Sequence, residues 1–471
     1  MAAAPERVAP ATWKVAGAVV LGGVMTSIDT TVVNVALDSL AHDFRASVTS
    51  VQWVATAYLL ALGIAMPLSG WATDRFGGKQ VWMISIGLFL VGSMLAGAAW
   101  SLGSLVCFRV LQGLGGGMIM PVGMTLVARA AGRGGVGRAM GSLGVQQLLG
   151  PVVGPVVGGV LVEHAGWRWI FYVNVPIGVL ALVAAAVFLA PSSPERRARL
   201  DGRGLLLLSP GLVGLVYGLA ETARTGTISS PRTLLPLVLG GALVVGFVLH
   251  AGHVRDPLID MRLFRERPFW AGAATSFCLG MALFGALFLL PLFYQGARGE
   301  SPLGAGLLLA PQGLGAALAM PLAGWLTDRL GAGRVVPAGL FLVIAGTLPF
   351  AVAGTSTPDP LLALALVLRG LGLGASTMPA MAAAYASLDE DAIARAASAL
   401  NVVKRLGGSI GVALIAVVLE HHLAGEAGSV SDRPGPVTDA FERSFWLVLG
   451  FSGLALVAAA FLPRRPAGAS R

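Results

Sequence analysis

Two charged residues, Asp29 and Arg109, fall inside long apolar stretches of this chain, where a charge is expensive. Asp29 is the only acid firmly inside any such stretch. A carboxylate surrounded by hydrocarbon is normally paired, protonated or turned toward a cavity, and each of these states suits a group that takes up and releases a proton. Asp29 is therefore a candidate proton carrier or a site for a cationic substrate. The alternative is a structural acid that neutralises a neighbouring base or bonds its own helix.

Arg109 is the natural partner of Asp29 if their two stretches run antiparallel through a membrane. Arg109 lies about 20 residues from Arg129 and Asp29 about 15 from Lys14, so at 1.5 Å per residue their depths agree within roughly 8 Å. A guanidinium beside the carboxylate stabilises its ionised form and eases proton release, which lets proton and substrate compete. We predict that the pair carries proton coupling. A structural Arg109 that bonds Gln112 or backbone carbonyls is the alternative.

Long apolar helices must position these residues, and the composition predicts them. Of 471 residues, 56% are hydrophobic and 12% are charged, with a mean hydropathy of +0.80. Soluble proteins carry about 25% charged residues. Because a bilayer offers no water to exposed backbone groups, its spans are helices or barrel strands, and apolar runs of about 20 residues favour helices. We therefore expect an all-α integral membrane protein.

Fourteen apolar runs are long enough to be transmembrane helices. Roughly three times as many Lys and Arg lie in the even-numbered loops and termini as in the odd-numbered loops, so we expect both termini in the cytoplasm and a multi-pass protein of the inner or plasma membrane. The runs cover residues 15–37, 51–72, 80–99, 103–127, 139–162, 167–190, 204–221, 233–250, 269–294, 303–326, 335–354, 359–385, 395–419 and 444–463.

The chain contains an internal duplication. Residues 66–79 read MPLSGWATDRFGGK, and residues 320–333 read MPLAGWLTDRLGAG, 254 positions later. Two fused halves of six spans would be offset by roughly 190 to 200 residues. Two inserted spans, the seventh and eighth, account for the excess. We expect a six-helix bundle over residues 1–190, an inserted hairpin with basic linkers over 191–268, and a second six-helix bundle over 269–471.

Five segments in this order resemble the major facilitator superfamily, and within it the fourteen-span drug:proton antiporters of the EmrB/QacA type. The resemblance runs nearly end to end and implies the major facilitator fold, with substrate bound between two bundles and access alternating between the two membrane faces. It also assigns Arg109 a role in proton transfer. The segments are IDTTVVNVAL (28–37), GWATDRFGGK (70–79), RVLQGLGGG (109–117), GPVVGPVVGG (150–159) and WRWIFYVNVPIG (167–178).

The fifth span carries the segment that resembles the antiporter motif. Three of its glycines recur every four residues on one helical face without side chains, while two prolines remove backbone donors, so the helix bends and packs closely. The resemblance associates this motif with export and with sealing of the domain interface. An ordinary packing seam is the alternative. The motif residues are Gly150, Pro151, Gly154, Pro155, Gly158 and Gly159.

The duplicated turns are candidate conformational gates at the cytoplasmic ends of the second and tenth spans. The resemblance implies that the acid of the first copy pairs with an Arg in only one state of the transport cycle. A turn that merely sets topology is the alternative, more so for the second copy, where Gly333 replaces the basic residue. The gating candidates are Gly70, Asp74, Arg75, Gly77, Lys79, Asp328 and Arg329.

The charged residues in the second half of the chain indicate which substrate charges the protein tolerates. The spans of this half contain no acid in their interiors but include Arg369, Lys404 and Arg405. A positive cavity repels a dication and tolerates neutral, zwitterionic or anionic groups. The roles of Arg369 and Arg405 are left open. Candidates for the cavity wall are Asn34, Tyr58, Gln112, Gln146, Gln147, Tyr294, Arg369, Asn401 and Lys404, with Trp53, Asn174 and Gln295 as further polar or aromatic positions.

The sequence therefore predicts proton-coupled export of a hydrophobic neutral or monocationic drug-like molecule by a protein that works as a monomer. The alternatives are export of an amphiphilic anion or metabolite, a nutrient facilitator on the same fold, and a receptor or enzyme. No enzyme activity, cofactor, metal or nucleic-acid partner is expected. No GxxxxGK[ST] motif occurs, and Cys107 and Cys278 are interpreted as small residues of the packed interior.

Overall fold

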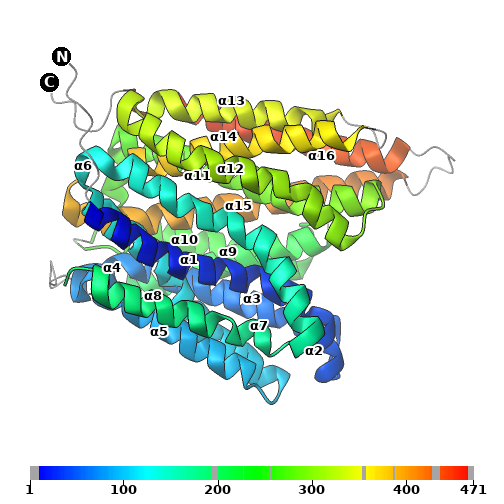
Figure 1. The fold of residues 1–471 in the computed structure, drawn as a ribbon, viewed down its shortest axis with the longest axis horizontal. Helices are drawn as coiled ribbons and strands as arrows, with labels where there is room; N and C mark the ends of the chain where they lie inside the picture. Colours follow the sequence, from blue (N-terminus) through cyan, green and yellow to red (C-terminus); the bar gives the residue numbers. More distant parts are fainter. Residues whose placement is uncertain are drawn as a thin grey trace. The chain divides into compact units, whose positions relative to one another are not determined.

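The structure is a computed structural model, and it describes residues 10–191, 200–225, 227–254, 256–352, 357–385, 388–426 and 435–464. Every regular element in these ranges is helical. Twelve helices within the described ranges are long and apolar enough to cross a membrane, or thirteen if one bent pair counts as a single span. The prediction of an all-α membrane protein is confirmed. The contacts divide the chain into two compact units (Figure 1).

The first unit comprises Met1–Pro210, Phe247–Met261 and Leu388–Asn401. In it α6 packs against α1, α3 and α5, and α8 packs against α1 and α5. The expected second span is the bent pair α3 and α4, which meet at 53°. The helices that lie wholly in this unit are α1 (Pro10–Val35), α2 (Leu37–Asp43), α3 (Val48–Ala65), α4 (Leu68–Phe76), α5 (Gly78–Gly97), α6 (Leu102–Ala165), α7 (Trp169–Tyr172) and α8 (Asn174–Phe188).

The helix α6 is two helices joined end to end. Its 64 residues would extend about 96 Å, three times the roughly 30 Å hydrocarbon core of a bilayer. Gly132 lies between them with φ 61° and ψ 178°, a conformation that strongly favours glycine. The first segment, Leu102–Gly132, is one of the candidate spans. The second contains the expected fifth span, where the side chains of residues 145–152, 155 and 156 lie outside the described part.

The second unit comprises Gly211–Gly246, Arg262–Ser387 and Val402–Arg471. Here α14 packs against α11, α12 and α13, and α16 packs against α11 and α13. Each of these pairs has a counterpart in the first unit, with α14 in the role of the first segment of α6. The two units therefore repeat one internal arrangement, as the duplicated turn indicates. The elements are α11 (Arg267–Leu292), the π-helical turn η2 (Phe293–Ala297), α12 (Pro302–Leu330), α13 (Ala332–Ala351), α14 (Asp359–Tyr385) and α16 (Gly435–Ala459).

Four elements are divided between the two units: α9 (Gly202–Thr225), α10 (Pro231–Ala251), the 3-10 turn η1 (Met261–Arg265) and α15 (Glu390–Glu426). The helices α9 and α10 coincide with the expected seventh and eighth spans. They touch through glycines, because a Cβ at Gly214 would lie 3.1 Å from the Cα of Gly240.

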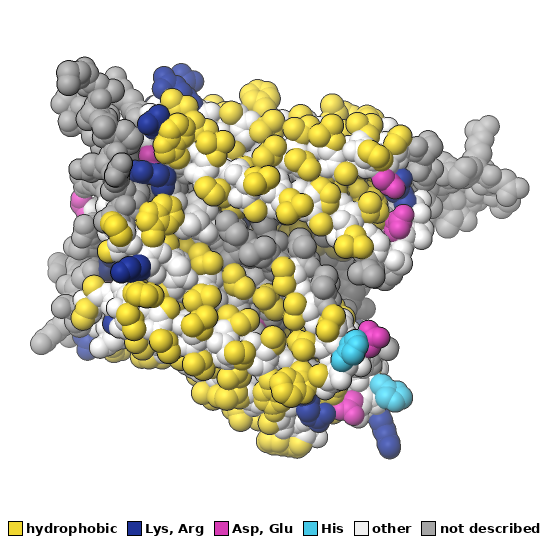
Figure 2. All heavy atoms as spheres, in the orientation of Figure 1, with side chains coloured by type: hydrophobic (Ala, Val, Ile, Leu, Met, Phe, Trp, Pro, Cys, Tyr) yellow, Lys and Arg dark blue, Asp and Glu magenta, His cyan; other side chains and the backbone are white. Residues whose placement is uncertain are grey.

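Apolar side chains cover the outer faces of the helices. On the face drawn in Figure 2, hydrophobic side chains occupy the middle of the helices, and charged side chains gather at their ends. Ile84 on α5, Val187 on α8 and Leu318 on α12 are 63%, 68% and 73% exposed. Large apolar patches of this kind are rare on monomeric soluble proteins, and here they fit contact with lipid chains.

Candidate functional site

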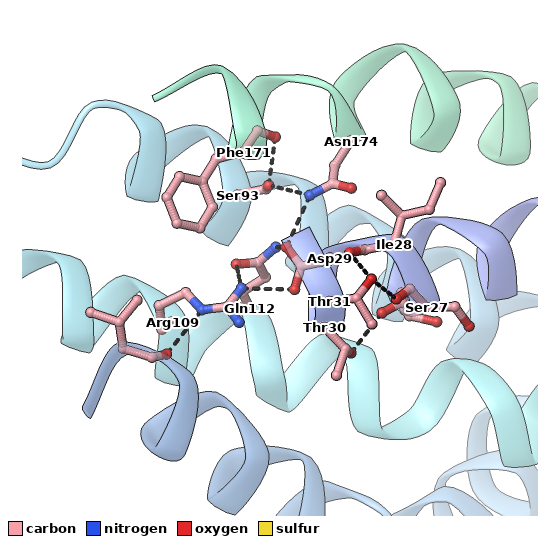
Figure 3. A network of polar contacts seen from close by, with 12 residues as sticks. Ser27, Ile28, Asp29, Thr30, Thr31, Ser93, Arg109, Gln112, Phe171 and Asn174 are labelled. Atoms are coloured by element: carbon pink, nitrogen blue, oxygen red, sulfur yellow. Dashed lines mark hydrogen bonds and ion pairs between the residues drawn. The ribbon is translucent and has the colours of Figure 1, made fainter. Parts of the chain in front are cut away.

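Asp29 lies at the centre of a buried polar network in the first unit (Figure 3). Its Oδ2 accepts a hydrogen bond from Arg109 Nη1 at 2.7 Å, which is also a salt bridge. Its Oδ1 accepts from Gln112 Nε2 at 2.8 Å and from Asn174 Nδ2 at 3.0 Å. Asp29, Arg109, Gln112 and Asn174 are each at most 1% exposed. The structure thus brings together Asp29 and Arg109 as their depths predict.

Three helices supply this network. Asp29 is on α1, Arg109 and Gln112 stand three residues apart on one face of α6, and Asn174 opens α8. Arg109 Nη1 also donates to Gln112 Oε1 at 2.7 Å, and its Nε donates to the Val54 carbonyl of α3 at 3.2 Å. The Gln112 side chain therefore joins the acid to the base, where the sequence predicted a residue of the cavity wall.

Aromatic rings surround the Arg109 guanidinium. Its carbon lies 4.0 Å from the centroid of the Tyr58 ring and 5.7 Å from that of Phe171. Cation–π contact stabilises a guanidinium most where water is absent, as here. Tyr58, another residue predicted for the cavity wall, is 1% exposed and packs against this charge.

The short turn before α8 brings Asn174 to Asp29. At its start the indole of Trp167 donates to Asp43 Oδ2 at 2.8 Å, and Arg168 Nη1 reaches the same oxygen at 3.3 Å. Ser93 on α5 accepts from Asn174 Nδ2 at 3.1 Å, and its hydroxyl donates to the Phe171 carbonyl at 2.8 Å.

Sequence reasoning missed Ser93 and assigned Asn174 only to the cavity wall. The segment WRWIFYVNVPIG pointed to Asn174, because it contains this residue together with Trp167 and Arg168, which hold the turn to Asp43.

Hydrogen-bond donors surround the Asp29 carboxylate. Three N–H groups, one of them on the Arg109 cation, donate to its two oxygens. Asn174 Oδ1 is buried and has no hydrogen-bond partner among the described residues. A half-turn of that amide would offer Oδ1 to a protonated carboxyl, replacing a donor by an acceptor. The amide of Asn174 on α8 can therefore present either a donor or an acceptor to the carboxyl group.

The acid of the first duplicated turn forms a second ion pair. Asp74 Oδ2 lies 3.7 Å from Arg395 Nε, and both residues belong to the first unit although Arg395 is on α15. Gly70 permits this approach, because a Cβ there would lie 3.1 Å from the Cα of Arg395. Ser398, one turn further along α15, donates to the Met66 carbonyl at 2.9 Å. The bent junction of α3 and α4 thus contacts the start of α15.

Both duplicated turns have one backbone conformation. Gly77 has φ 85° and Gly331 has φ 82°, a region that favours glycine, and each N–H donates to the threonine carbonyl four residues earlier at 2.9 Å. Arg75 is exposed, and Asp328 is half-buried. The guanidinium of Arg329, itself exposed, stacks 4.1 Å from the Trp325 ring.

Lys79 of the first copy and Gly333 of the second contact equivalent helix ends, those of α8 and α16. Lys79 Nζ donates to the carbonyls of Ala186 at 2.9 Å and Leu189 at 2.6 Å, which caps the C-terminus of α8. In the second copy Gly333 donates its backbone N–H to the Pro463 carbonyl, beyond the end of α16, at 2.9 Å. A backbone group replaces the lysine ammonium, so the loss of the base does not remove the contact.

The glycines of the GPVVGPVVGG segment pack on α1. A Cβ at Gly154 would overlap the side chain of Thr31, and one at Gly158 would lie 3.3 Å from Val32 Cγ1. A Cβ at Gly159 would meet nothing within 4 Å. The glycine face therefore packs inside the first unit, against the helix that carries Asp29. The side-chain environments of Gly150, Pro151 and Pro155 lie outside the described part.

The remaining cavity candidates are spread over both units. In the first, Asn401 Nδ2 donates to the Ala397 carbonyl at 2.8 Å and contacts Met124 Sδ at 3.4 Å. In the second, Tyr294 packs in an aromatic cluster with Phe293 and Phe350, and Lys404 is buried. The side chains of Asn34, Gln146 and Gln147 lie outside the described part.

Arg369 is 1% exposed and bonds Gln312 Oε1 and the Ala282 carbonyl. No group of His, Cys, Asp or Glu that could hold a metal occurs among the described residues.

Comparison with known proteins identifies the relatives of this chain. The family model of the Major Facilitator Superfamily matches residues 19–412. A multidrug resistance protein B homolog of Mycobacterium tuberculosis strain H37Rv is 42% identical over 420 residues, which are 88% of this chain and 78% of that protein. The tetracenomycin C resistance and export protein of Streptomyces glaucescens is 30% identical over 408 residues, 86% of this chain and 76% of that protein.

A solved structure shares the fold. The proton:xylose symporter XylE superposes with a TM-score of 0.66 at 15% sequence identity, covering 96% of this chain and 95% of that one. These matches confirm the resemblance that the five sequence segments indicated.

Proposed function

The chain belongs to the major facilitator superfamily, and we propose that it exports hydrophobic neutral or monocationic drug-like molecules in exchange for protons. It is a membrane transporter and not an enzyme. The observation that carries the proposal is the buried Asp29 carboxylate, held between Arg109, Gln112 and Asn174. A single carboxylate without a cage of further oxygen ligands suits a proton better than Na⁺, and an ion gradient must supply the energy because no ATP-binding motif occurs.

In this proposal the coupling step is a competition for the Asp29 carboxylate. Arg109 keeps it ionised until a proton arrives, and protonation frees the guanidinium and the amides of Gln112 and Asn174 for other contacts. Because these groups lie on α6 and α8, the change spreads from α1 to two further helices. Relatives named for multidrug resistance and for antibiotic export support the outward direction and the substrate class.

We further propose fourteen spans, in the order six, two, six, with both termini in the cytoplasm of a cell-membrane protein. The break at Gly132 divides α6 into two spans, and the bent pair α3 and α4 forms another. The three-part division at residues 190 and 268 and the function as a monomer belong to the same proposal. Asp74 and Arg395 then form a cytoplasmic latch that holds in one conformation only.

The direct test is drug efflux from proteoliposomes with and without a pH gradient. Asp29→Asn should lose the acceleration by the gradient, because an amide accepts no proton at neutral pH, while Asp29→Glu should retain part of it. Thermal unfolding of the purified variants, compared with that of the wild type, serves as the folding control. Full gradient-driven export by Asp29→Asn would remove the coupling assignment.

A second substrate class is favoured by one observation. The buried Arg369 of the second unit bonds a neutral amide and a carbonyl, and none of its bonds to described residues is to a carboxylate. An amphiphilic anion is therefore the alternative substrate.

A further inference from the structure

Arg369 on α14 is a buried cation without a nearby acid. It is 1% exposed, and it donates to Gln312 Oε1 and, at 3.3 Å, to the Ala282 carbonyl. Among the described residues, its Nε has no hydrogen-bond partner and no acid forms a salt bridge with it. A guanidinium keeps its proton in proteins, so it cannot neutralise itself as a buried lysine can. Such a charge normally has a counter-charge.

Packing shows that Arg369 occupies the place of Gln112 in the duplicated architecture. A Cβ at Gly92 on α5 would lie 2.6 Å from the Gln112 nitrogen, and a Cβ at Gly346 on α13 would meet the nitrogen of Arg369. Gly346 follows Gly92 by 254 positions, the offset of the duplicated turns. The match is therefore structural and does not depend on how the two Gly-rich segments are aligned.

Gln312, the hydrogen-bond partner of Arg369, corresponds to Tyr58 of the first unit. Gly113, next to Gln112, packs on the Tyr58 carbonyl, and Gly370, next to Arg369, packs on the Gln312 carbonyl. Gln312 again follows Tyr58 by 254 positions. An amide thus replaces the phenol ring that covers the guanidinium in the first unit.

The position of Asp29 is taken by Ala282. Ala380 of α14 corresponds to Gly123 of α6, because it follows Gly123 by 257 positions, as Arg369 follows Gln112. A Cβ at Gly123 would meet Val19 of α1, and a Cβ at Gly272 of α11 would lie 2.9 Å from the Ala380 carbonyl. Gly272 follows Val19 by 253 positions, and that offset carries Asp29 to Ala282. The second unit therefore keeps a cation at the duplicated site but lacks the carboxylate that balances it in the first.

The helix that carries Lys404 packs beside this site. Lys404 of α15 is buried, and its backbone carbonyl meets the Cβ position of Gly280, two residues from Ala282. Asp29 and Arg109 form an ion pair in the first unit, whereas Arg369 forms none with the described residues of the second. An anion entering it would gain a bidentate guanidinium fork and the amide of Gln312.

We propose that Arg369 and Gln312 form a binding site for a monovalent anionic group, a carboxylate or a small inorganic anion, at the place that corresponds to the Asp29 carboxylate. The site deepens the proposed function where the anionic group belongs to the exported molecule, but binding itself does not require proton coupling. The duplication has thus produced a proton site in one unit and an anion site in the other.

The test measures thermal unfolding of the purified full-length protein in sodium gluconate, chloride, acetate and benzoate at constant ionic strength. Gluconate is the reference, because its long hydroxylated chain would have to lose its water in a buried site. For the wild type we expect a saturable rise of the midpoint in at least one of the last three salts relative to gluconate. Arg369→Gln should lose this anion-dependent shift. Arg232→Gln, a change at an exposed arginine of α10, should keep it.

A second variant protects the test against misfolding of the first. Ala282→Asp restores a carboxylate at the duplicated position, so it should also lose the anion-dependent shift, and its midpoint in gluconate should exceed that of the wild type. A wild type that responds equally to all four salts, or variants at Arg369 and Ala282 that respond as the wild type does, would overturn the proposal.

The salts also separate the two sources of the anion. A shift in chloride alone identifies a small inorganic ion, and a larger shift in benzoate identifies the carboxylate of an amphiphilic molecule. Because no transport is measured, the anion site can fail while proton-driven efflux persists, and the reverse holds as well.

Discussion

At the scale of single residues, charge balance distinguishes the two halves of this transporter. Asp29 and Arg109 neutralise one another at 2.7 Å, and two amides satisfy the second carboxylate oxygen. Breaking a buried pair by removing one partner typically costs about 3 to 5 kcal/mol, because the other charge is left buried alone. Loss of either charge should therefore disturb the whole network, as the proposed coupling requires.

Arg109→Ala is predicted to reduce gradient-driven efflux and to destabilise the protein by about 3 to 5 kcal/mol. Without the guanidinium the buried carboxylate of Asp29 is left without its counter-charge. Efflux from proteoliposomes and thermal unfolding in detergent measure the two effects. Arg109→Lys retains the charge and should lose less of both. Wild-type efflux by Arg109→Ala would contradict a role for Arg109 in coupling.

At the scale of helices, glycines bring the chemistry together. Gly92 lets α5 approach the backbone of Gln112, and Gly113 lets α6 approach the Tyr58 carbonyl of α3. With no side chain between them, these helices pack backbone to backbone, as small-residue interfaces in membranes do. The same contacts recur around α14, so the Gly-rich segments of α6 and α14 are packing surfaces that hold Gln112 and Arg369 at equivalent places.

Gly92→Ala is predicted to destabilise the protein by about 1 to 3 kcal/mol, the usual cost of overpacking. The added methyl would lie 2.6 Å from the Gln112 nitrogen, so α5 and α6 would have to separate, and efflux should fall with stability. Gly87→Ala on the same helix is the matched control, because a Cβ there meets nothing within 4 Å. Thermal unfolding in detergent compares the two, and equal midpoints would count against close packing at Gly92.

At the scale of the whole molecule, the two units share one arrangement of helices but differ in their charged side chains. Both units share the same pairs of packed helices and the same glycine turn, at Gly77 and Gly331. The copies differ in one polar contact, because Lys79 caps α8 with its side chain where Gly333 uses its backbone beside α16. Asp74 of the first copy forms an ion pair with Arg395. We interpret the first turn as a latch and the second as a structural counterpart.

Weakening the Asp74–Arg395 pair is predicted to change the balance between transport conformations. The charged atoms lie 3.7 Å apart, too far for a hydrogen bond, so each single neutralisation should cost about 1 kcal/mol, roughly a fivefold change in the ratio of two states. Asp74→Asn and Arg395→Gln should slow efflux. The charge exchange, Asp74→Arg with Arg395→Asp, should restore part of it. Strictly additive effects in this double-mutant cycle would show that the pair is not a latch.

The sequence alone determined the class of the protein, the positions of most helices, the duplication and the pairing of Asp29 with Arg109. These follow from quantities that are local to the chain, namely apolar run length, a repeat offset and a constant rise of 1.5 Å per residue, which sets depth in a membrane. Depth does not tell which way a side chain points around its helix axis.

Only the tertiary structure decided the lateral neighbours. It brought Asn174 to Asp29, gave Lys79 the carbonyls of α8 as partners and set Ala282 opposite Arg369 at the place of an acid. Rotation of a helix and the choice of its neighbours result from packing between segments far apart in the chain, here through glycines that permit backbone contact. No local pattern encodes that arrangement, and the chemistry of both sites depends on it.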